Sequence, residues 1–117
     1  MAPVYSLDCP ECCPPCDYNI FVRVEHYPNG DNVIMFYFYA FGNLNFFSVG
    51  NPNQIDETNG NFSTTLQNGA SADYSSGSVV LVYGDKTITF TNLTTNSGTT
   101  SANVKWWEIS SNTCSEA

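Results

Sequence analysis

The chain has 117 residues, of which 42% are hydrophobic and 12% charged, and its formal net charge is −8. One domain with a packed core fits this length and composition, whereas three basic residues are too few to bind nucleic acid or an anionic membrane surface. No apolar run reaches the roughly 20 residues that cross a bilayer, and residues 1–9 lack the basic and apolar regions of a secretory signal.

Residues 1–17 form the first predicted segment, an N-terminal arm rich in proline and cysteine. Its prolines stand at positions 3, 10, 14 and 15, and the last three lie between its four cysteines. Proline fixes φ and lacks a backbone donor, so we expect this arm to be extended and not helical. At Tyr18 the composition changes abruptly to that of β-strands.

Two strands joined by a tight turn are predicted next, at residues 18–27 and 32–41. In the first, Ile20, Val22 and Val24 alternate with Phe21, Arg23 and Glu25. The turn at 28–31 contains Asn-Gly, which tolerates positive φ. In the second strand the predicted core face is as follows: Ile34, Phe36, Phe38 and Ala40.

The rest of the chain predicts shorter strands separated by loops. We expect strands at residues 44–49, 61–67, 78–83, 86–91 and 102–109. Gly84-Asp85 is a two-residue hairpin turn, and it directs Ile88 and Phe90 inward. Residues 50–60, 71–77 and 92–101 are predicted loops, and 110–117 a polar C-terminal tail.

About seven strands without a helical period predict an all-β fold. We expect an antiparallel β-sandwich over residues 18–109, immunoglobulin-like or jelly-roll-like, with a small barrel as the other architecture. The pattern does not separate these topologies.

The cysteines are the most distinctive feature of the sequence. They are Cys9, Cys12, Cys13, Cys16 and Cys114. We favour a disulfide or an intermolecular staple, because an odd count leaves one thiol free or paired with another chain. Zinc or an iron–sulfur cluster on the four arm cysteines is the minority interpretation, since zinc ligands usually come from two separated segments. Unpaired thiols and a redox role are the remaining interpretations, and no other cofactor is expected.

Catalytic constellations are not evident, so we expect no enzyme. His26 is the single histidine, and no Gly-x-Ser-x-Gly motif accompanies it. Asp56, Glu57 and Asp73 fall in predicted loops, where solvated carboxylates or at most a weak calcium site are the natural interpretations.

Aromatic residues are the second distinctive feature, because both faces of the strand at 32–41 are apolar. The face opposite the predicted core suits either a buried central strand or a subunit interface. The candidate interface residues are Met35, Tyr37, Tyr39, Phe41, Trp106 and Trp107. Adjacent strand residues point in opposite directions, so only one of the two tryptophans should face the core. A sugar-stacking platform is the alternative use of these rings.

The pattern resembles the small virion structural proteins of tailed bacteriophages, especially capsid decoration (cement) proteins. The resemblance is carried by a β-rich body, an N-terminal arm and an Asn-, Ser- and Thr-rich surface, as in residues 91–100. It implies an oligomer that braces a shell through contacts with a major capsid protein and with copies of itself, located in the virion after synthesis in the host cytoplasm. The arm cysteines have no counterpart in that family.

Two other functions remain as alternatives. One is an extracellular adhesin or carbohydrate-binding module, which predicts exposed tryptophan and a leader removed from a longer precursor. The other is a phage tail or baseplate component.

Overall fold

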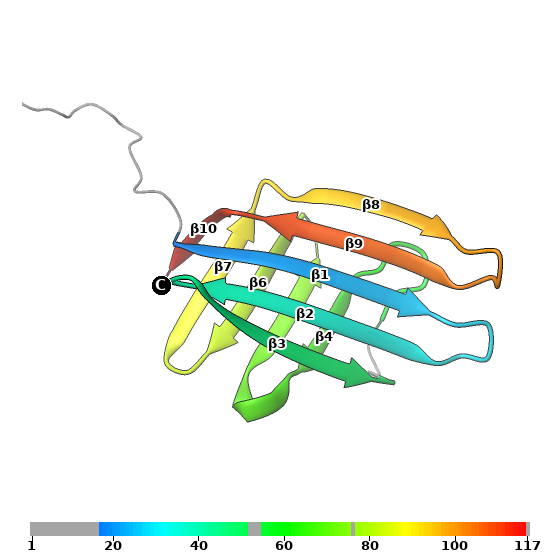
Figure 1. The fold of residues 1–117 in the computed structure, drawn as a ribbon, viewed down its shortest axis with the longest axis horizontal. Helices are drawn as coiled ribbons and strands as arrows, with labels where there is room; N and C mark the ends of the chain where they lie inside the picture. The colour runs from blue at the N-terminus through cyan, green and yellow to red at the C-terminus, as the bar shows by residue number, and fades with distance from the viewer. Residues whose placement is uncertain (1–16, 52–54, 76, 117) are drawn as a thin grey trace, which may run out of the picture.

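The computed structural model describes residues 17–51, 55–75 and 77–116. In these ranges the chain forms two five-stranded antiparallel sheets that stack face to face (Figure 1). The first sheet has the order β3-β2-β1-β9-β8, and the second has the order β10-β7-β6-β5-β4. The expected all-β sandwich is therefore confirmed. None of the described helices is long and apolar enough to cross a membrane.

The first sheet contains the longest strands. Its members are β1 (Tyr18–His26), β2 (Asn32–Ala40), β3 (Asn43–Gly50), β8 (Thr94–Thr99) and β9 (Lys105–Ser111). The second sheet is made of β4 (Phe62–Thr65), β5 (Ser71–Ser75), β6 (Ser78–Tyr83), β7 (Lys86–Thr91) and β10 (Thr113–Glu116), with a short 3-10 helix η1 (Gln67–Gly69) between β4 and β5. Strands β1–β3 and β4–β7 are two consecutive meanders, after which β9 pairs with β1, β8 pairs with β9 at the edge of the first sheet, and β10 joins β7.

The β1–β2 hairpin sets the register of the first sheet. Val22 lies opposite Phe36 and Val24 opposite Ile34, as the alternating pattern predicts. The turn is closed by a hydrogen bond from the Tyr27 N–H to the Asp31 carbonyl at 2.8 Å.

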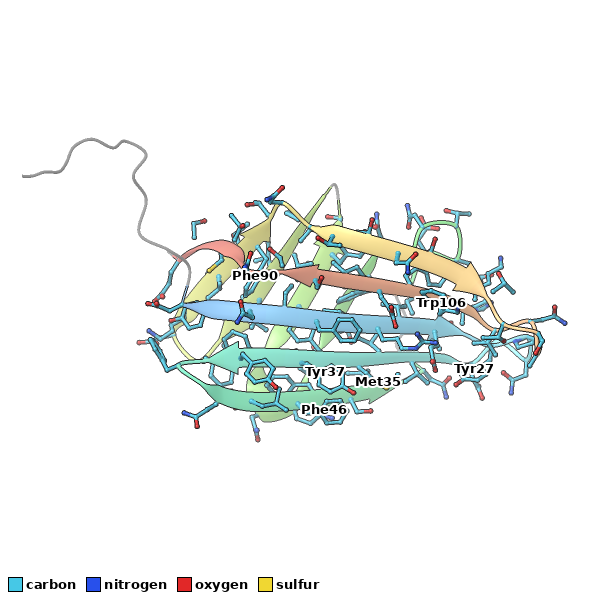
Figure 2. The ribbon with its side chains drawn as sticks, turned by 45° about the horizontal axis from the view of Figure 1, so that its top comes forward. Tyr27, Met35, Tyr37, Phe46, Phe90 and Trp106 are labelled. Carbon is cyan, nitrogen blue, oxygen red and sulfur yellow. The ribbon has the colours of Figure 1, made fainter. Side chains whose placement is uncertain are left out.

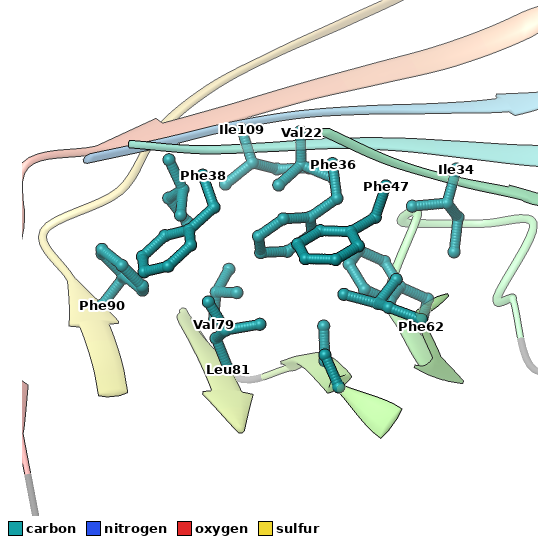
Figure 3. Close-up of a cluster of buried hydrophobic side chains, with 14 of the residues drawn as sticks. Val22, Ile34, Phe36, Phe38, Phe47, Phe62, Val79, Leu81, Phe90 and Ile109 are labelled. Carbon is teal, nitrogen blue, oxygen red and sulfur yellow. The ribbon is translucent and has the colours of Figure 1, made fainter. Parts of the chain in front are cut away.

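The core lies between the sheets, and both contribute to it (Figure 3). The predicted inward residues of β2 are confirmed, because Ile34, Phe36 and Phe38 are at most 1% exposed. On the second sheet Ile88 and Phe90 are fully buried, as expected. Ala40 is partly buried and packs against the same cluster.

Three predicted irregular segments are wrong, because they contain strands. Residues 71–77 include β5, residues 92–101 include β8, and the expected polar tail includes β10. The described residues thus hold ten strands, more than the seven or so expected. These strands are rich in Ser, Thr and Asn, and β8 lies at an edge of its sheet with almost all of its residues exposed. Their pairing depends on a neighbouring strand, which a hydrophobic pattern does not report.

Two predicted strand ends also differ. Phe41 falls in the β2–β3 turn with φ 52°, so β2 ends at Ala40. The last predicted strand at 102–109 lies at Lys105–Ser111, because Asn103 adopts φ 64° in a turn where its N–H bonds the Thr100 carbonyl.

Ser111 holds the corner where the chain passes from the first sheet to the second. Its side chain is buried; Oγ donates to the Thr91 carbonyl at 2.6 Å and accepts the Thr113 N–H at 3.1 Å. One hydroxyl therefore satisfies a carbonyl and an amide at the point where β9 gives way to β10.

Replacing this hydroxyl should destabilise the sandwich. Ser111→Ala is expected to lower the free energy of unfolding by about 1–3 kcal/mol, since it leaves both backbone groups without their partner. Urea denaturation measures the change. Ser110→Ala is the control, because Ser110 lies on the outer face of the sheet, as the cross-strand partner of Phe21. Equal midpoints for the two variants would contradict the assigned role of Ser111.

Candidate interaction surface

The outer face of the first sheet carries a row of aromatic side chains. Phe46, Tyr37 and Phe21 are cross-strand neighbours on β3, β2 and β1. Their ring centroids lie 4.8 Å apart for Tyr37–Phe46 and 5.8 Å apart for Phe21–Tyr37. Figure 2 shows Tyr37, Met35 and Phe46 side by side on this face. Each is one residue out of phase with the core, so the same alternation that fills the interior places these rings outside.

Exposed apolar side chains gather around this row. Phe46 is 51% exposed and Phe21 39% exposed, and the cross-strand pair Leu44 and Tyr39 is 49% and 44% exposed. We call the following residues the aromatic patch: Phe21, Met35, Tyr37, Tyr39, Leu44 and Phe46. Phe41, at the β2–β3 turn, and Val82, on the second sheet, are the further large apolar side chains that are exposed among the described residues.

The patch is comparable in size with the largest apolar patch of a typical monomer. With about 150–250 Å² for each ring, the exposed fractions of Phe21, Tyr39, Phe46 and Leu44 correspond to about 300–400 Å² of side-chain surface. The largest apolar patch on a monomer is usually about 300–600 Å² and often functional. It is also uncharged, because the sequence from Asn32 to Asn51 contains no Asp, Glu, Lys or Arg.

A charged cluster borders the patch on β1 and β9. The Arg23 guanidinium contacts Glu25 and Glu108, at 2.7 Å in each case, and its Cζ lies 5.0 Å from the Trp106 ring centroid. The Tyr27 hydroxyl donates to Glu25 at 2.7 Å. The outer face is thus divided into an aromatic half and a hydrogen-bonded charged half.

This cluster changes the acidity of its members. The hydrogen bond to Glu25 is the main cause that raises the pKa of Arg23. Partial burial acts to raise the pKa of Glu25, but the hydrogen bonds from Tyr27 and Arg23 outweigh it and leave that pKa lowered. The hydrogen bond to Glu25 also raises the pKa of Tyr27. All three groups therefore keep their ordinary charge states at neutral pH.

The two tryptophans point in opposite directions, as the alternation predicts. Trp106 lies on the outer face against Gly98 of β8, where a β-carbon would come within 2.8 Å of the indole. Trp107 lies on the inner side, packs against the core and covers Gly60, whose φ is +78°. Each indole occupies the space that a glycine leaves open.

The predicted interface residues therefore divide into three groups. Met35, Tyr37, Tyr39 and Trp106 lie on the outer face, and Phe41 stands at the β2–β3 turn with its ring against the buried Tyr18. Trp107 is instead a core-packing residue. The candidates missed Phe21, Leu44 and Phe46, which only the strand register brings next to Tyr37 and Tyr39.

The predicted cysteine site falls mostly outside the described residues. Cys9, Cys12, Cys13 and Cys16 are not among them. Cys114 lies on β10 opposite Phe90 and is disulfide-bonded. Its thiol is therefore used in a covalent bond.

His26 and the acidic residues predicted to lie in loops are found near one end of the sandwich. His26 Nε2 is 3.2 Å from the Glu57 carboxylate, and its Nδ1 is 2.6 Å from the Asn32 side-chain oxygen. Asp56, Glu57 and Asp73 line an open groove of about 750 Å³. The Asp56 carboxylate accepts from the Thr58 hydroxyl and amide, and these bonds lower its pKa. Across residues 17–51, 55–75 and 77–116, no three acidic, His or Cys side chains form a potential metal site.

Comparison with protein-family models, with curated proteins and with solved structures finds no match.

Filling the space beneath Trp107 should destabilise the fold. Gly60→Ala is expected to lower the free energy of unfolding by more than about 1 kcal/mol, because its β-carbon would lie 2.5 Å from the indole Cγ and φ is positive. Gly69→Ala is the control, since φ is +75° there and nothing lies within 4 Å. Guanidinium denaturation of both variants measures the difference, and equal losses would contradict the steric explanation.

The free energy of unfolding should decrease as the pH is lowered through the acid range. Glu25 has a lowered folded pKa, so its contribution is present above its ordinary value of 4.5 and is lost as pH falls through the folded pKa. Thermal melts between pH 7 and pH 3 measure the slope. Glu25→Gln should show a shallower decline than the wild type, and parallel curves for the two proteins would refute the linkage.

Proposed function

We propose that this protein is a non-enzymatic assembly subunit that binds another protein through the aromatic patch. The observation that carries the proposal is an exposed, uncharged array of Phe, Tyr and Met side chains on the outside of a sheet that has the core on its other face. These rings do not complete the interior of the domain, so their exposure needs another explanation.

The composition of the surface supports a protein partner. Aromatic residues and methionine are enriched at the centres of protein interfaces, and charged groups are enriched at their rims. Here the Arg23–Glu25–Glu108 cluster borders the patch on one side. The net charge of −8 disfavours nucleic acid and anionic lipid as partners.

In its finer form, the proposal is that the chain decorates a viral capsid. The resemblance to bacteriophage cement proteins implies a major capsid protein as the partner and the virion as the location. Many copies on one shell would add avidity to a contact of modest area. A tail or baseplate position would use the same surface in the same way.

Removing one ring of the patch should release the protein from its assembly. Phe21→Ser is expected to weaken binding roughly ten-fold, the usual effect of losing an interface aromatic. Val82→Ser is the matched control, because Val82 is 37% exposed against 39% for Phe21 but lies on the second sheet.

The measurement is sedimentation of lysates from the cells that naturally make the protein, in which the tagged chain is followed through the fractions. We expect the wild type and Val82→Ser to sediment with a large particle and Phe21→Ser to shift to the free fraction. A wild type found only as a free species would overturn the proposal. So would a soluble glycan that binds the patch and is lost in Phe21→Ser, since that result identifies a carbohydrate-binding module.

A further inference from the structure

The open edge of β3 differs from the other three sheet edges. At the second sheet β4 and β10 are only four residues long, and β8 is a polar strand of Thr, Asn, Ser and Gly. Strand β3 has eight residues, with the sequence NLNFFSVG, and contains neither charge nor proline. Proteins usually protect such edges, because unpaired backbone groups are a template for another strand.

The hydrogen bonds between β3 and β2 determine which backbone groups of β3 face the open edge. The Asn51 N–H bonds the Asn32 carbonyl at 2.6 Å, so the alternate residues of β3 that bond β2 are the odd-numbered ones. The N–H and C=O groups of Leu44, Phe46 and Ser48 therefore point away from β2. Among the described strands, β2 is the sole partner of β3.

Gln67 closes this edge at one position. Its side-chain oxygen accepts the Ser48 N–H at 3.2 Å, and its side-chain nitrogen donates to the Ser48 carbonyl. The amide group thus imitates a neighbouring strand for a single residue. It leaves the edge groups of Leu44 and Phe46 as the segment that an added strand could pair with.

We propose that a second copy of this chain pairs with β3, antiparallel and about a two-fold axis at Asn45. Leu44 of one copy then lies opposite Phe46 of the other, and the two residues exchange backbone hydrogen bonds on both sides of the axis. In this register Ser48 lies opposite Gly42 of the other copy, where the chain turns. Both Gln67 caps therefore stay outside the paired segment.

The hydrogen-bond pattern favours a second copy as the occupant, because the open segment from Leu44 to Phe46 is its own antiparallel complement about Asn45. Each copy carries a net charge of −8, yet the sequence from Asn32 to Asn51 has no charged residue, so two copies meet where repulsion is weakest. The side chains of Leu44 and Phe46 lie on the outer face. The pairing consequently joins the two aromatic patches into one continuous surface. The dimer extends the proposed function but does not depend on it.

Sedimentation equilibrium of the purified chain in a dilution series tests the pairing. We expect reversible formation of a species with twice the 12.9 kDa mass of the chain. Leu44→Pro removes the outward N–H without removing a bond to β2, and should weaken dimerisation at least about ten-fold. Leu44→Ala is the matched control, because it loses the same side chain but keeps the N–H.

Hydrogen exchange on the wild-type protein gives a second measurement that does not depend on a variant. Protection of the Leu44 and Phe46 amides should rise with protein concentration. The Ser48 amide, which Gln67 already binds, should change little. Circular dichroism of both Leu44 variants confirms that they are folded.

The possible failures are distinct. A strictly monomeric wild type, or a dimer that Leu44→Pro and Leu44→Ala disturb equally, overturns strand pairing. Neither result affects the aromatic patch as a binding surface, which is tested with Phe21→Ser and not at the edge.

Discussion

The β1–β2 register is the constraint on which the rest of the structure depends. Nine consecutive residue pairs, from Tyr18 opposite Ala40 to His26 opposite Asn32, place every second side chain of both strands on the same side. A shift by one residue would exchange the two faces completely. It would either send Phe36 and Phe38 of β2, which are almost fully buried, to solvent or bring Arg23 of β1 into the core. Burial of the inward side chains therefore also determines which side chains lie on the outer face of the sheet.

This coupling explains how a domain of this size keeps an apolar surface outside. The interior is closed by side chains from both sheets, and the inward residues of β6 and β7 complete it without any contribution from the outer face of β2. Tyr37 and its neighbours are thus left to pack on one another, and the charged cluster around Arg23 fixes the opposite half of the same sheet. The patch and the open edge of β3 share Leu44 and Phe46: their side chains belong to the patch, and their backbone groups face the edge.

The features that could be predicted from the sequence are those with a local signal. The hairpins at β1–β2 and β6–β7 have alternating apolar residues around a tight turn, and both were expected at nearly the observed positions. Strands β5, β8 and β10 were missed because their Ser, Thr and Asn residues carry no hydrophobic alternation, and they are strands because a neighbour supplies hydrogen bonds. Likewise Phe21 and Phe46 could not be assigned to a surface with Tyr37, since they are distant in sequence and meet only through register.

The sequence by itself determined the all-β class, the core face of the aromatic strand and the opposite directions of the two tryptophans, because side-chain alternation is a property of any extended chain. The tertiary structure decided which strands became neighbours. That order put three aromatic strand segments into one exposed row, left β3 at an edge, and set Gln67 against Ser48. Each of these depends on contacts between residues far apart in the chain, and the energy of such contacts is not encoded in any local pattern.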